Sequence, residues 1–307
     1  MKIALVNPLA GYGRAMIALR RIRKFLSHLK ARIRILKPHE SIREMISGIG
    51  EPEYLIVIGG DGTVRSAVDA LLGRGLKNVI LVPYLGGSGG ELSHYANLLS
   101  PENLREAFLH GNVEDIDVYR TEVELSNGEK RRLIFVANLQ IGHFAQGIKE
   151  TPGISKRILG SQGYMIGVMK AIMKRVNKYV TVSSRNFSFS GFIYTIHFGN
   201  TSTTRGGVPV APLANPMDGK LDMMLAKAIS RREAIRALPS VLRGKHLSHY
   251  AVIYKQFSHP VMISLDNDHV AVDGEYLGLA KSVRIEAVGK IKLLCNKRKL
   301  EGSGGSI

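Results

Sequence analysis

The sequence predicts two domains: an α/β domain with a mostly parallel sheet at residues 1–117, and a β-rich domain with antiparallel, sandwich-like order at residues 118–287. In the first part, apolar runs of strand length alternate with amphipathic helical segments, which is typical of a parallel sheet covered by helices on both faces. In the second part, short β-like runs follow each other between turn residues, which favours an antiparallel sandwich. With 307 residues and 45% hydrophobic composition, the chain is long enough to bury a core in both domains.

The elements of the first domain alternate in order along the chain. Helices are expected up to about Leu29, near Ile42 and up to about Leu72, and strands at Lys2 to Val6, Arg32 to Leu36, Tyr54 to Ile58 and Asn78 to Val82. Ligands of such sheets bind at the carboxyl ends of the strands. Three loops follow strands, at Asn7 to Gly13, Gly59 to Thr63 and Gly86 to Gly90, and we expect them to converge on one crevice.

The second domain contains one predicted helical insertion, near Gly163 to Asn177, among many short strands. The strands are expected at Tyr119 to Leu125, Arg132 to Asn138, Val180 to Ser184, Phe192 to Phe198, Leu221 to Ala226, Val261 to Leu265, His269 to Val272, Val283 to Ala287 and Ile291 to Leu294. The segment at about 288–300 could return to the first domain. Residues 301–307 are rich in glycine and serine and read as a flexible tail.

The chain is strongly basic, with 43 Lys and Arg against 25 Asp and Glu and a net charge of +18. Such a charge suits nucleic acid, anionic lipid or a polyphosphate substrate as partner, and alone it does not choose among them. Cys295 is the single cysteine, which excludes a disulfide framework and indicates a cytoplasmic protein. No apolar run is long enough to span a membrane, so contact with lipid would be made from the surface.

The loop Gly59-Gly60-Asp61-Gly62-Thr63 lies between an apolar strand and a helical segment. Glycines at this place let backbone N–H groups approach a phosphate at the positive end of a helix. Asp61 could bind a metal or a sugar hydroxyl, and Thr63 could cap the helix. The expected ligand is a nucleotide with Mg²⁺, although an ordinary tight turn remains the simpler alternative. A P-loop and a dinucleotide fingerprint are both absent from the sequence.

The second glycine-rich loop, Gly86 to Gly90, also fits the G-x-S-x-G pattern of a hydrolase nucleophile elbow. Ser88 would then be the nucleophile, and Asp218 and His269 follow it in the order that a catalytic triad requires. This alternative leaves the loop at Gly59 to Thr63 without a role. The hydrolase is therefore the minor hypothesis.

Two turns of the second domain carry carboxylates. Asp218 lies in a segment rich in turn residues from Asn215 to Asp222, and Asp273 and Glu275 flank a glycine after a short strand. Both turns can be explained as exposed hairpins. For the first turn, the more specific alternative is a hard cation bound by Asp218 and nearby carbonyl groups. The histidines His246 and His249 and the acidic run Asp266-Asn267-Asp268 read as surface features.

Several of these motifs, taken in order, resemble the diacylglycerol kinase-like lipid kinase family over nearly the whole chain. They are Val6-Asn7-Pro8 with Gly11, Gly59 to Thr63, Gly87-Ser88-Gly89, Ile141-Gly142-His143-Phe144-Ala145, Gly206-Gly207 to Pro212, Asp218-Gly219-Lys220-Leu221-Asp222 and Asp273-Gly274-Glu275. NAD kinases share the first glycine loop and a similar two-domain plan. The C-terminal motifs distinguish this chain from them, and no Asn-Asp/Glu pair stands at the position where NAD kinases use one.

The resemblance implies a kinase that transfers the γ-phosphate of ATP to a lipid hydroxyl, with ATP held between the domains. By position in the motifs, Asp273 and Glu275 would be catalytic, with Glu275 as general base. Asn215, Asp218 and Lys220 would surround Mg²⁺, the first and last through carbonyl groups. The residues implied in nucleotide binding are Asn7, Gly11, Gly59, Gly60, Asp61, Gly62, Thr63, Ser88 and Glu91.

One loop departs from the family pattern. Where the family has Gly-Thr-Gly-Asn-Asp, this chain has Gly87-Ser88-Gly89-Gly90-Glu91, so that an amide is lost at Gly90 and the carboxylate is one methylene longer at Glu91. A catalytically silent lipid- or nucleotide-binding protein and an NAD kinase-like enzyme therefore stay open beside the lipid kinase. The implied partners are ATP and a lipid at the inner membrane surface, with no nucleic acid, and a homodimer is compatible with the sequence.

Overall fold

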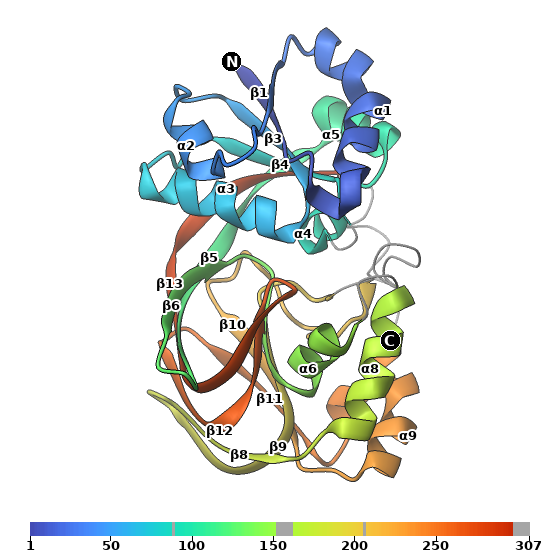
Figure 1. Ribbon diagram of the computed structural model, residues 1–307, viewed down its shortest axis with the longest axis vertical. Coiled ribbons are helices and arrows are strands. Elements are labelled where there is room, and N and C mark those ends of the chain that lie inside the picture. Colours follow the sequence, from blue (N-terminus) through green and yellow to red (C-terminus); the bar gives the residue numbers. More distant parts are fainter. Residues whose placement is uncertain (88–89, 152–161, 205–206, 297–307) are drawn as a thin grey trace. The chain divides into compact units, whose positions relative to one another are not determined.

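Figure 1 shows the computed structural model, which describes residues 1–87, 90–151, 162–204 and 207–296. The chain divides into two compact units. Unit 1 comprises Met1–Ile116 together with the chain from Lys290 on, and unit 2 comprises Asp117–Gly289. Unit 1 is an α/β structure and unit 2 is rich in antiparallel strands, which confirms the predicted fold class. The tail predicted at 301–307 lies outside the described residues.

The sheet of unit 1 is parallel, in the order β2-β1-β3-β4 followed by the end of β13. Its interior strands β1 and β3 are almost continuously apolar, as strands covered by helices on both faces must be. At the far edge, Lys292 and Leu293 pair with Ile80 and Leu81 of β4. The strands are β1 (Lys2–Val6), β2 (Arg32–Ile35), β3 (Tyr54–Gly59), β4 (Ile80–Leu85) and β13 (Glu275–Cys295).

The helices of unit 1 are amphipathic and carry recognisable start signals. The Ser41 side chain accepts a hydrogen bond from the Glu44 N–H while Glu44 bonds back to the Ser41 N–H, so these two residues form a capping box that begins α2. Ser100 caps α5 in a similar way, with proline at the first helical position. The helices are η1 (Ala10–Gly13), α1 (Arg14–His28), α2 (Ile42–Ser47), α3 (Asp61–Gly73), α4 (Glu91–Tyr95) and α5 (Pro101–His110).

The sheet of unit 2 is antiparallel, in the order β11-β10-β9-β7-β12-β13, with β8 paired to both β9 and β12, and β5 paired to β6 and β13. Large side chains such as Phe135 and Phe198 fill its core without exposure to solvent. The strands that unit 2 adds are β5 (Asn112–Leu125), β6 (Lys130–Phe135), β7 (Asn138–Gly142), β8 (Lys178–Ser184), β9 (Phe187–Gly199), β10 (Leu221–Lys227), β11 (Val252–Phe257) and β12 (Val261–Val272).

The strand predicted at Arg132 to Asn138 is in fact two strands, β6 and β7. They are interrupted at Val136 and Ala137 because the N–H groups of these residues donate hydrogen bonds to the Asp273 carboxylate and not to a neighbouring strand. The two runs predicted at Val261 to Leu265 and His269 to Val272 are one strand, β12, with an irregular register between Ser264 and Asp268. Strand β11 was missed by the prediction.

Three helices lie on one side of the unit 2 sheet in Figure 1: α6 (His143–Glu150), α8 (Gln162–Lys174) and α9 (Arg231–Leu242), of which the sequence predicted only α8. Helix α6 starts directly after β7 at Gly142, whose φ of 81° lies in the left-handed region. A Cβ there would come within 2.8 Å of the Tyr194 carbonyl oxygen and 2.9 Å of an Arg175 nitrogen. Both geometry and space therefore require glycine at this position. No helix in the described ranges is long and apolar enough to cross a membrane.

A buried ion pair fixes the region between α8 and β12. The Arg175 guanidinium forms two hydrogen bonds to the Asp268 carboxylate, at 2.6 and 2.7 Å, and donates a third to the Tyr194 carbonyl oxygen at 2.8 Å. The side chains are 2% and 1% exposed. The interpretation of Asp268 as a surface residue was therefore wrong. His246 is also buried, with Nε2 at 3.0 Å from the Val210 carbonyl oxygen, which corrects its assignment to the surface.

Two buried histidines make unit 2 sensitive to acid. Burial lowers the pKa of both His143 and His197 from the usual 6.5 to about 3. The positive charge of Arg175 contributes to the shift of His143, and His246 contributes to that of His197. As the pH falls, these histidines bind protons in the unfolded chain before they do so in the folded one. The free energy of unfolding is therefore unaffected by their titration above pH 6.5 and decreases between about pH 6.5 and 3. Near pH 5 we expect a loss of about 2 kcal/mol for each histidine.

The measurement is urea denaturation between neutral pH and about pH 5, comparing the wild type with His197→Phe, which keeps a ring but cannot titrate. The variant is expected to lose less stability on acidification, whatever its stability at neutral pH. An unchanged pH dependence in His197→Phe would contradict the assignment to this histidine.

Candidate functional site

Three loops of unit 1 contact each other at the carboxyl ends of β1, β3 and β4. The Asn7 side-chain amide donates a hydrogen bond to the Thr63 hydroxyl at 3.0 Å, which joins the first loop to the second. The Gly86 N–H donates to the Gly59 carbonyl oxygen at 3.0 Å, which joins the second loop to the third. The expected meeting of these loops at one edge of the sheet is therefore present.

Asp61 connects the second loop to the start of α4. Its two carboxylate oxygens accept hydrogen bonds from the backbone N–H groups of Gly90 at 3.0 Å and Glu91 at 2.7 Å. A carboxylate accepts more than one hydrogen bond on each oxygen, so these contacts leave it further acceptor capacity. In this structure Asp61 orders the third loop, a role that the sequence did not predict.

The first turn of α3 is open to a ligand. A Cβ atom placed on Gly60 or Gly62 would meet no atom within 4 Å, so the backbone is accessible there. Gly60 is the N-cap residue, and no side chain among the described residues caps the helix; Thr63 lies inside the helix and its hydroxyl instead accepts from Asn7. The prediction that Thr63 caps α3 was wrong. A helix of this length with an uncapped, accessible N-terminus suits a phosphate group.

The remaining glycines are needed because the loops pack backbone against backbone. A Cβ on Gly11 would come within 2.9 Å of the Gly86 carbonyl oxygen, and one on Gly87 within 2.9 Å of the Gly60 Cα. Glu91 is buried at the start of α4. Ser88, expected to contact nucleotide, lies outside the described residues.

The turn between β12 and β13 is anchored by Asp273. This side chain is 2% exposed, and its oxygens accept hydrogen bonds from the N–H groups of Val136 at 3.1 Å and of Ala137 and Asn138 at 3.0 Å. The simple alternative of an exposed hairpin therefore fails for Asp273. Glu275, two residues later, opens β13 with an exposed side chain.

The loop from Asn215 to Lys220 is held by its own side chains and by Asp117. The Asp218 carboxylate accepts from the Lys220 N–H at 2.9 Å, and the Asn215 side-chain oxygen accepts from the Met217 N–H at 3.2 Å. Asp117 accepts from the Gly219 N–H at 2.8 Å. Asp117 carries no sequence motif, and its role became visible only in the structure.

The oxygens around Asp218 are compatible with a hard cation. In the described part of the chain no three His, Cys, Asp or Glu side chains are grouped to hold a metal, so carbonyl groups would have to complete such a site. Asp222 lies near enough for the Asp218 charge to act on it. Burial, with this charge as a lesser cause, raises the pKa of Asp222, and its Oδ2 atom is buried without a hydrogen-bond partner among the described residues. An oxygen-only donor set with an unsatisfied carboxylate fits Mg²⁺.

An apolar cavity of about 70 Å³ lies within unit 2. Helices α6, α8 and α9 and strands β9 and β10 supply its walls, which include Phe144, Ile172, Tyr194, Met224 and Val241. The cluster that forms these walls also contains Ala271 and packs against Tyr276. These two residues flank the turn of Asp273 and Glu275, so the cavity and the turn share one packed region.

The triad proposed for a hydrolase is not assembled around His269. The Nδ1 atom of His269 lies 2.7 Å from the Tyr276 hydroxyl, and Asp218 forms its hydrogen bond within its own loop. In the described structure Asp218 therefore does not orient His269 through Nδ1 as the triad requires.

Comparisons with known proteins agree with this arrangement. Residues 2–121 match the family described as diacylglycerol kinase catalytic domain, and residues 148–294 match the YegS C-terminal NAD kinase beta sandwich-like domain. The diacylglycerol kinase of Bacillus subtilis is 23% identical over 83% of this chain and 82% of its own length. That of Mycobacterium tuberculosis H37Rv is 23% identical over 80% of this chain and 79% of its own length.

Solved structures show the same fold. A diacylglycerol kinase of Bacillus anthracis aligns with a TM-score of 0.66 and 17% identity, covering 96% of this chain and 97% of that one. An NAD kinase of Archaeoglobus fulgidus in complex with ATP aligns with a TM-score of 0.52 and 12% identity, covering 98% of this chain and 96% of that one.

The fold is thus of the class found in a diacylglycerol kinase and an NAD kinase of known structure. Within that class, residues 2–121 belong to the diacylglycerol kinase catalytic domain family, and residues 148–294 form a YegS-type NAD kinase beta sandwich-like domain. The family resemblance expected from the sequence motifs is confirmed.

Proposed function

We propose that this protein is an ATP-dependent lipid kinase that transfers the γ-phosphate to the hydroxyl of a diacylglycerol-like lipid. One observation carries the choice of a lipid: the apolar cavity of unit 2 shares its packed wall with Ala271 and Tyr276, which flank the Glu275 turn. The apolar lining of this cavity suits hydrocarbon groups and offers little to a dinucleotide. Opening of α8 or α9 would be needed to admit a whole chain, since the closed cavity is narrow.

The loops of unit 1 would hold ATP. Backbone N–H groups at the start of α3 bind phosphate oxygens, and the accessible Gly60 and Gly62 let the phosphates approach them. Asp61 supports this arrangement by fixing the third loop through Gly90 and Glu91. Asn7 fixes Thr63 from the other side. The proposed nucleotide-binding residues are those of the three loops, Ser88 included.

Glu275 would act as general base. Its carboxylate takes the proton of the acceptor hydroxyl while the hydroxyl oxygen forms a bond to the γ-phosphorus, and the bond from that phosphorus to the bridging oxygen breaks to release ADP. Asp273, with three backbone N–H groups on its carboxylate, would hold the turn in place and so position Glu275. We therefore propose distinct roles for the two carboxylates, with contact to the acceptor only at Glu275.

Mg²⁺ would be held by the Asp218 carboxylate with carbonyl oxygens of Asn215 and Lys220. When bound, it supplies positive charge that neutralises neighbouring carboxylates. Asp117 keeps the loop in shape through the Gly219 N–H, and this contact does not depend on a cation.

The test is incubation of the purified protein with radiolabelled ATP, Mg²⁺ and a total lipid extract, followed by identification of the labelled product. We expect label in a phosphomonoester lipid and none in NADP when NAD is supplied instead. Label in NADP alone would replace the lipid kinase by an NAD kinase-like activity. Absence of transfer to either acceptor, with ATP still bound, would indicate a catalytically silent protein.

A further inference from the structure

Unit 1 has a concave surface, a groove of about 830 Å³ between α1 and α5. Lys2 and Tyr54, at the amino ends of β1 and β3, lie in it, whereas the glycine loops follow the carboxyl ends of the strands. The groove is therefore at the opposite end of the sheet from the proposed nucleotide site. Nothing in the proposed phosphoryl transfer uses it.

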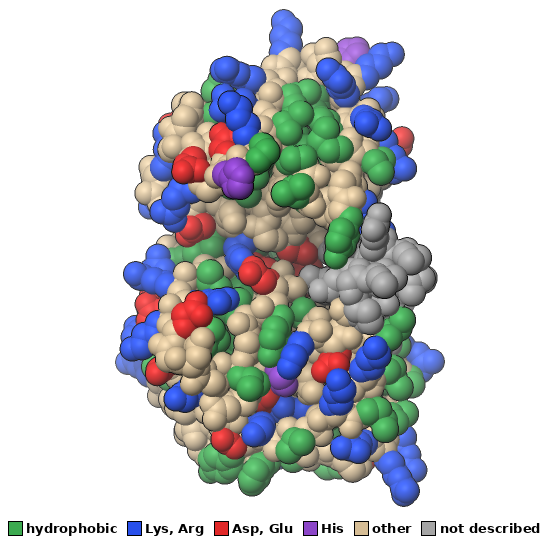
Figure 2. Space-filling model, in the orientation of Figure 1, with side chains coloured by type: hydrophobic (Ala, Val, Ile, Leu, Met, Phe, Trp, Pro, Cys, Tyr) green, Lys and Arg blue, Asp and Glu red, His purple; other side chains and the backbone are tan. Residues whose placement is uncertain are grey.

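The floor of the groove is aromatic. The Phe108 ring lies 5.7 Å from the Phe25 ring and 5.1 Å from the Tyr54 ring, centroid to centroid. All three side chains are partly buried, and Leu109 beside them is 66% exposed. Figure 2 shows hydrophobic side chains gathered over this part of unit 1, with Lys and Arg side chains around them. The exposed Leu109 and the partly buried rings together give the groove an apolar surface that an apolar group could cover.

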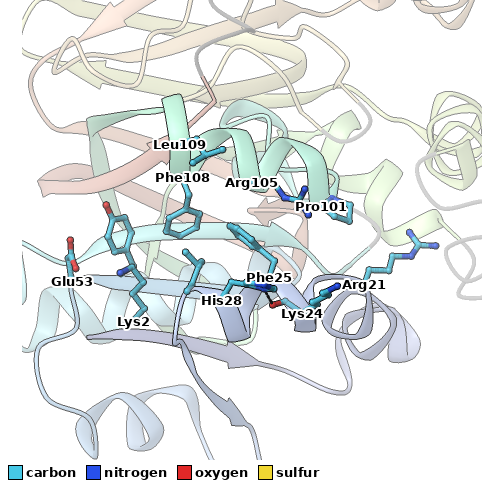
Figure 3. A pocket seen from close by; sticks show the side chains of 12 residues that line it. Lys2, Arg21, Lys24, Phe25, His28, Glu53, Pro101, Arg105, Phe108 and Leu109 are labelled. Atoms are coloured by element: carbon cyan, nitrogen blue, oxygen red, sulfur yellow. Dashed lines mark hydrogen bonds between the residues drawn. The ribbon is translucent and has the colours of Figure 1, made fainter.

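The border of the groove is cationic. Arg21 and Lys24 of α1 and Arg105 of α5 gather at one end, and Phe25 and Phe108 lie between them and the other end (Figure 3). All three cations are exposed, and none forms a salt bridge within the described ranges of the chain.

At the other end, Lys2 lies over the Tyr54 ring at 5.6 Å, close to Glu53. Glu53 is the acidic side chain among the described residues that line the groove, against Lys2, Arg21, Lys24 and Arg105. The balance of charge along the groove is therefore positive.

We propose that this groove is the membrane-docking surface of the protein and that it binds anionic phospholipids of a bilayer. Phosphate groups would contact Arg21, Lys24 and Arg105, while Leu109 and the aromatic edges enter the interface between headgroups and acyl chains. The choice of a lipid as occupant rests on the proposed lipid kinase function. An acidic protein would satisfy the cations, but it would leave the apolar floor unexplained.

The position of the groove also suits this role. Its distance from the glycine loops along the strands leaves the nucleotide site of unit 1 free for ATP from the aqueous phase while the groove faces the bilayer. Helix α1 adds Arg20 and Arg23 near the same end and contains no acidic residue, so its exposed side is attracted to an anionic surface as a whole.

The experiment is co-sedimentation of the full chain with vesicles of phosphatidylcholine alone or mixed with phosphatidylglycerol, without ATP. The variant Arg21→Gln/Lys24→Gln/Arg105→Gln removes the groove cations. The matched control Arg185→Gln/Lys255→Gln/Lys281→Gln removes three exposed charges from unit 2, where none of these side chains forms a salt bridge within the described residues. Leu109→Ser tests the apolar part without changing charge.

We expect the wild type to bind only the anionic vesicles. The groove variant should bind them on the order of 100-fold more weakly, because each Lys or Arg near an anionic membrane contributes about 1 kcal/mol. The control should stay within several-fold of the wild type. Leu109→Ser should weaken the binding that persists at high salt, where charge is screened.

Equal loss in the two triple variants would overturn the proposal, because binding would then follow net charge and not the groove. Competition by soluble glycerol phosphate at concentrations that do not change ionic strength would indicate a small-molecule site instead. Binding of an acidic polypeptide, with the same dependence on the groove cations and no vesicle binding, would also overturn it.

The variant Glu275→Gln separates this inference from the proposed function. It should bind anionic vesicles as the wild type does, since Glu275 belongs to unit 2 and not to the groove. Vesicle binding without lipid phosphorylation in the wild type would sustain the docking surface and refute the kinase. Lipid phosphorylation by the wild type, together with unchanged vesicle binding in the groove variant, would sustain the kinase and refute the docking surface.

Discussion

Replacement of Glu275 by glutamine is expected to lower phosphoryl transfer by about 10²–10⁴-fold, the usual contribution of a positioned general base. Glutamine keeps the size and the hydrogen-bonding oxygen of the side chain but cannot accept a proton from the acceptor hydroxyl. Because the side chain is exposed at the start of β13, the substitution should leave folding unchanged. The measurement is the turnover number with saturating ATP and lipid.

ATP affinity provides the internal check, since the proposed nucleotide contacts all lie in unit 1. It should be the same in Glu275→Gln and in the wild type. Glu286, a half-buried glutamate further along β13 that pairs with Arg284 and Arg120, supplies a matched control. Glu286→Gln should keep nearly full activity. Wild-type turnover in Glu275→Gln would remove this residue from the role of base.

Replacement of Arg175 by methionine is expected to lower the free energy of unfolding of unit 2 by about 3–5 kcal/mol, the cost of leaving one partner of a buried ion pair without the other. Methionine keeps most of the apolar stem, but the Asp268 carboxylate would lose both of its guanidinium hydrogen bonds. The carbonyl oxygen of Tyr194 would also lose the hydrogen bond that it accepts from Arg175. Urea denaturation followed by circular dichroism measures the effect.

The neighbouring residue gives a control for this variant. Lys174 forms a salt bridge with Glu150 at 2.8 Å, but its side chain is 61% exposed. Lys174→Met should therefore change stability by no more than about 0.5 kcal/mol. The double variant Arg175→Met/Asp268→Leu, which removes both charges, should recover part of the loss. Equal stabilities for Arg175→Met and Lys174→Met would show that the buried pair contributes no more than a surface pair.

The glycine loops of unit 1 could be predicted because their positions follow from the alternation of strands and helices. Parallel strands that end in the same direction bring Asn7, Asp61 and Gly90 to one edge, whatever the details of packing. The partners of Asp61 could not be predicted in this way. They are backbone N–H groups, which every residue carries, so no side-chain pattern marks them.

Asp268 shows a different limit of sequence reasoning. Along β12 the buried positions are Val261, Ile263 and Leu265, and alternation from these would continue at odd numbers. The irregular register between Ser264 and Asp268 shifts the alternation by one residue, so Asp268 faces the interior. Its partner Arg175 lies 93 residues earlier in the chain, beyond the range of any local pattern.

The candidate site was predicted as a set of motifs, while the residues that support it were not. Glu275 and Asp218 were singled out because they stand beside glycines in turns. Asp117 and Tyr276, by contrast, stand in ordinary strand surroundings, and only the folded chain reveals that one holds the Asp218 loop and the other packs beside the cavity. Tertiary contacts over long separations in sequence account for this difference.

Strand β13 has a consequence for how the protein is made. Its last residues pair with β4 and so complete the sheet of unit 1, although β4 is synthesised about 200 residues earlier. During translation the hydrogen-bonding edge of β4 must stay without this partner until Lys292 and Leu293 have left the ribosome. An unpaired strand edge is a site for aggregation. Unit 1, although it comes first in the sequence, therefore cannot complete its sheet until unit 2 has been synthesised.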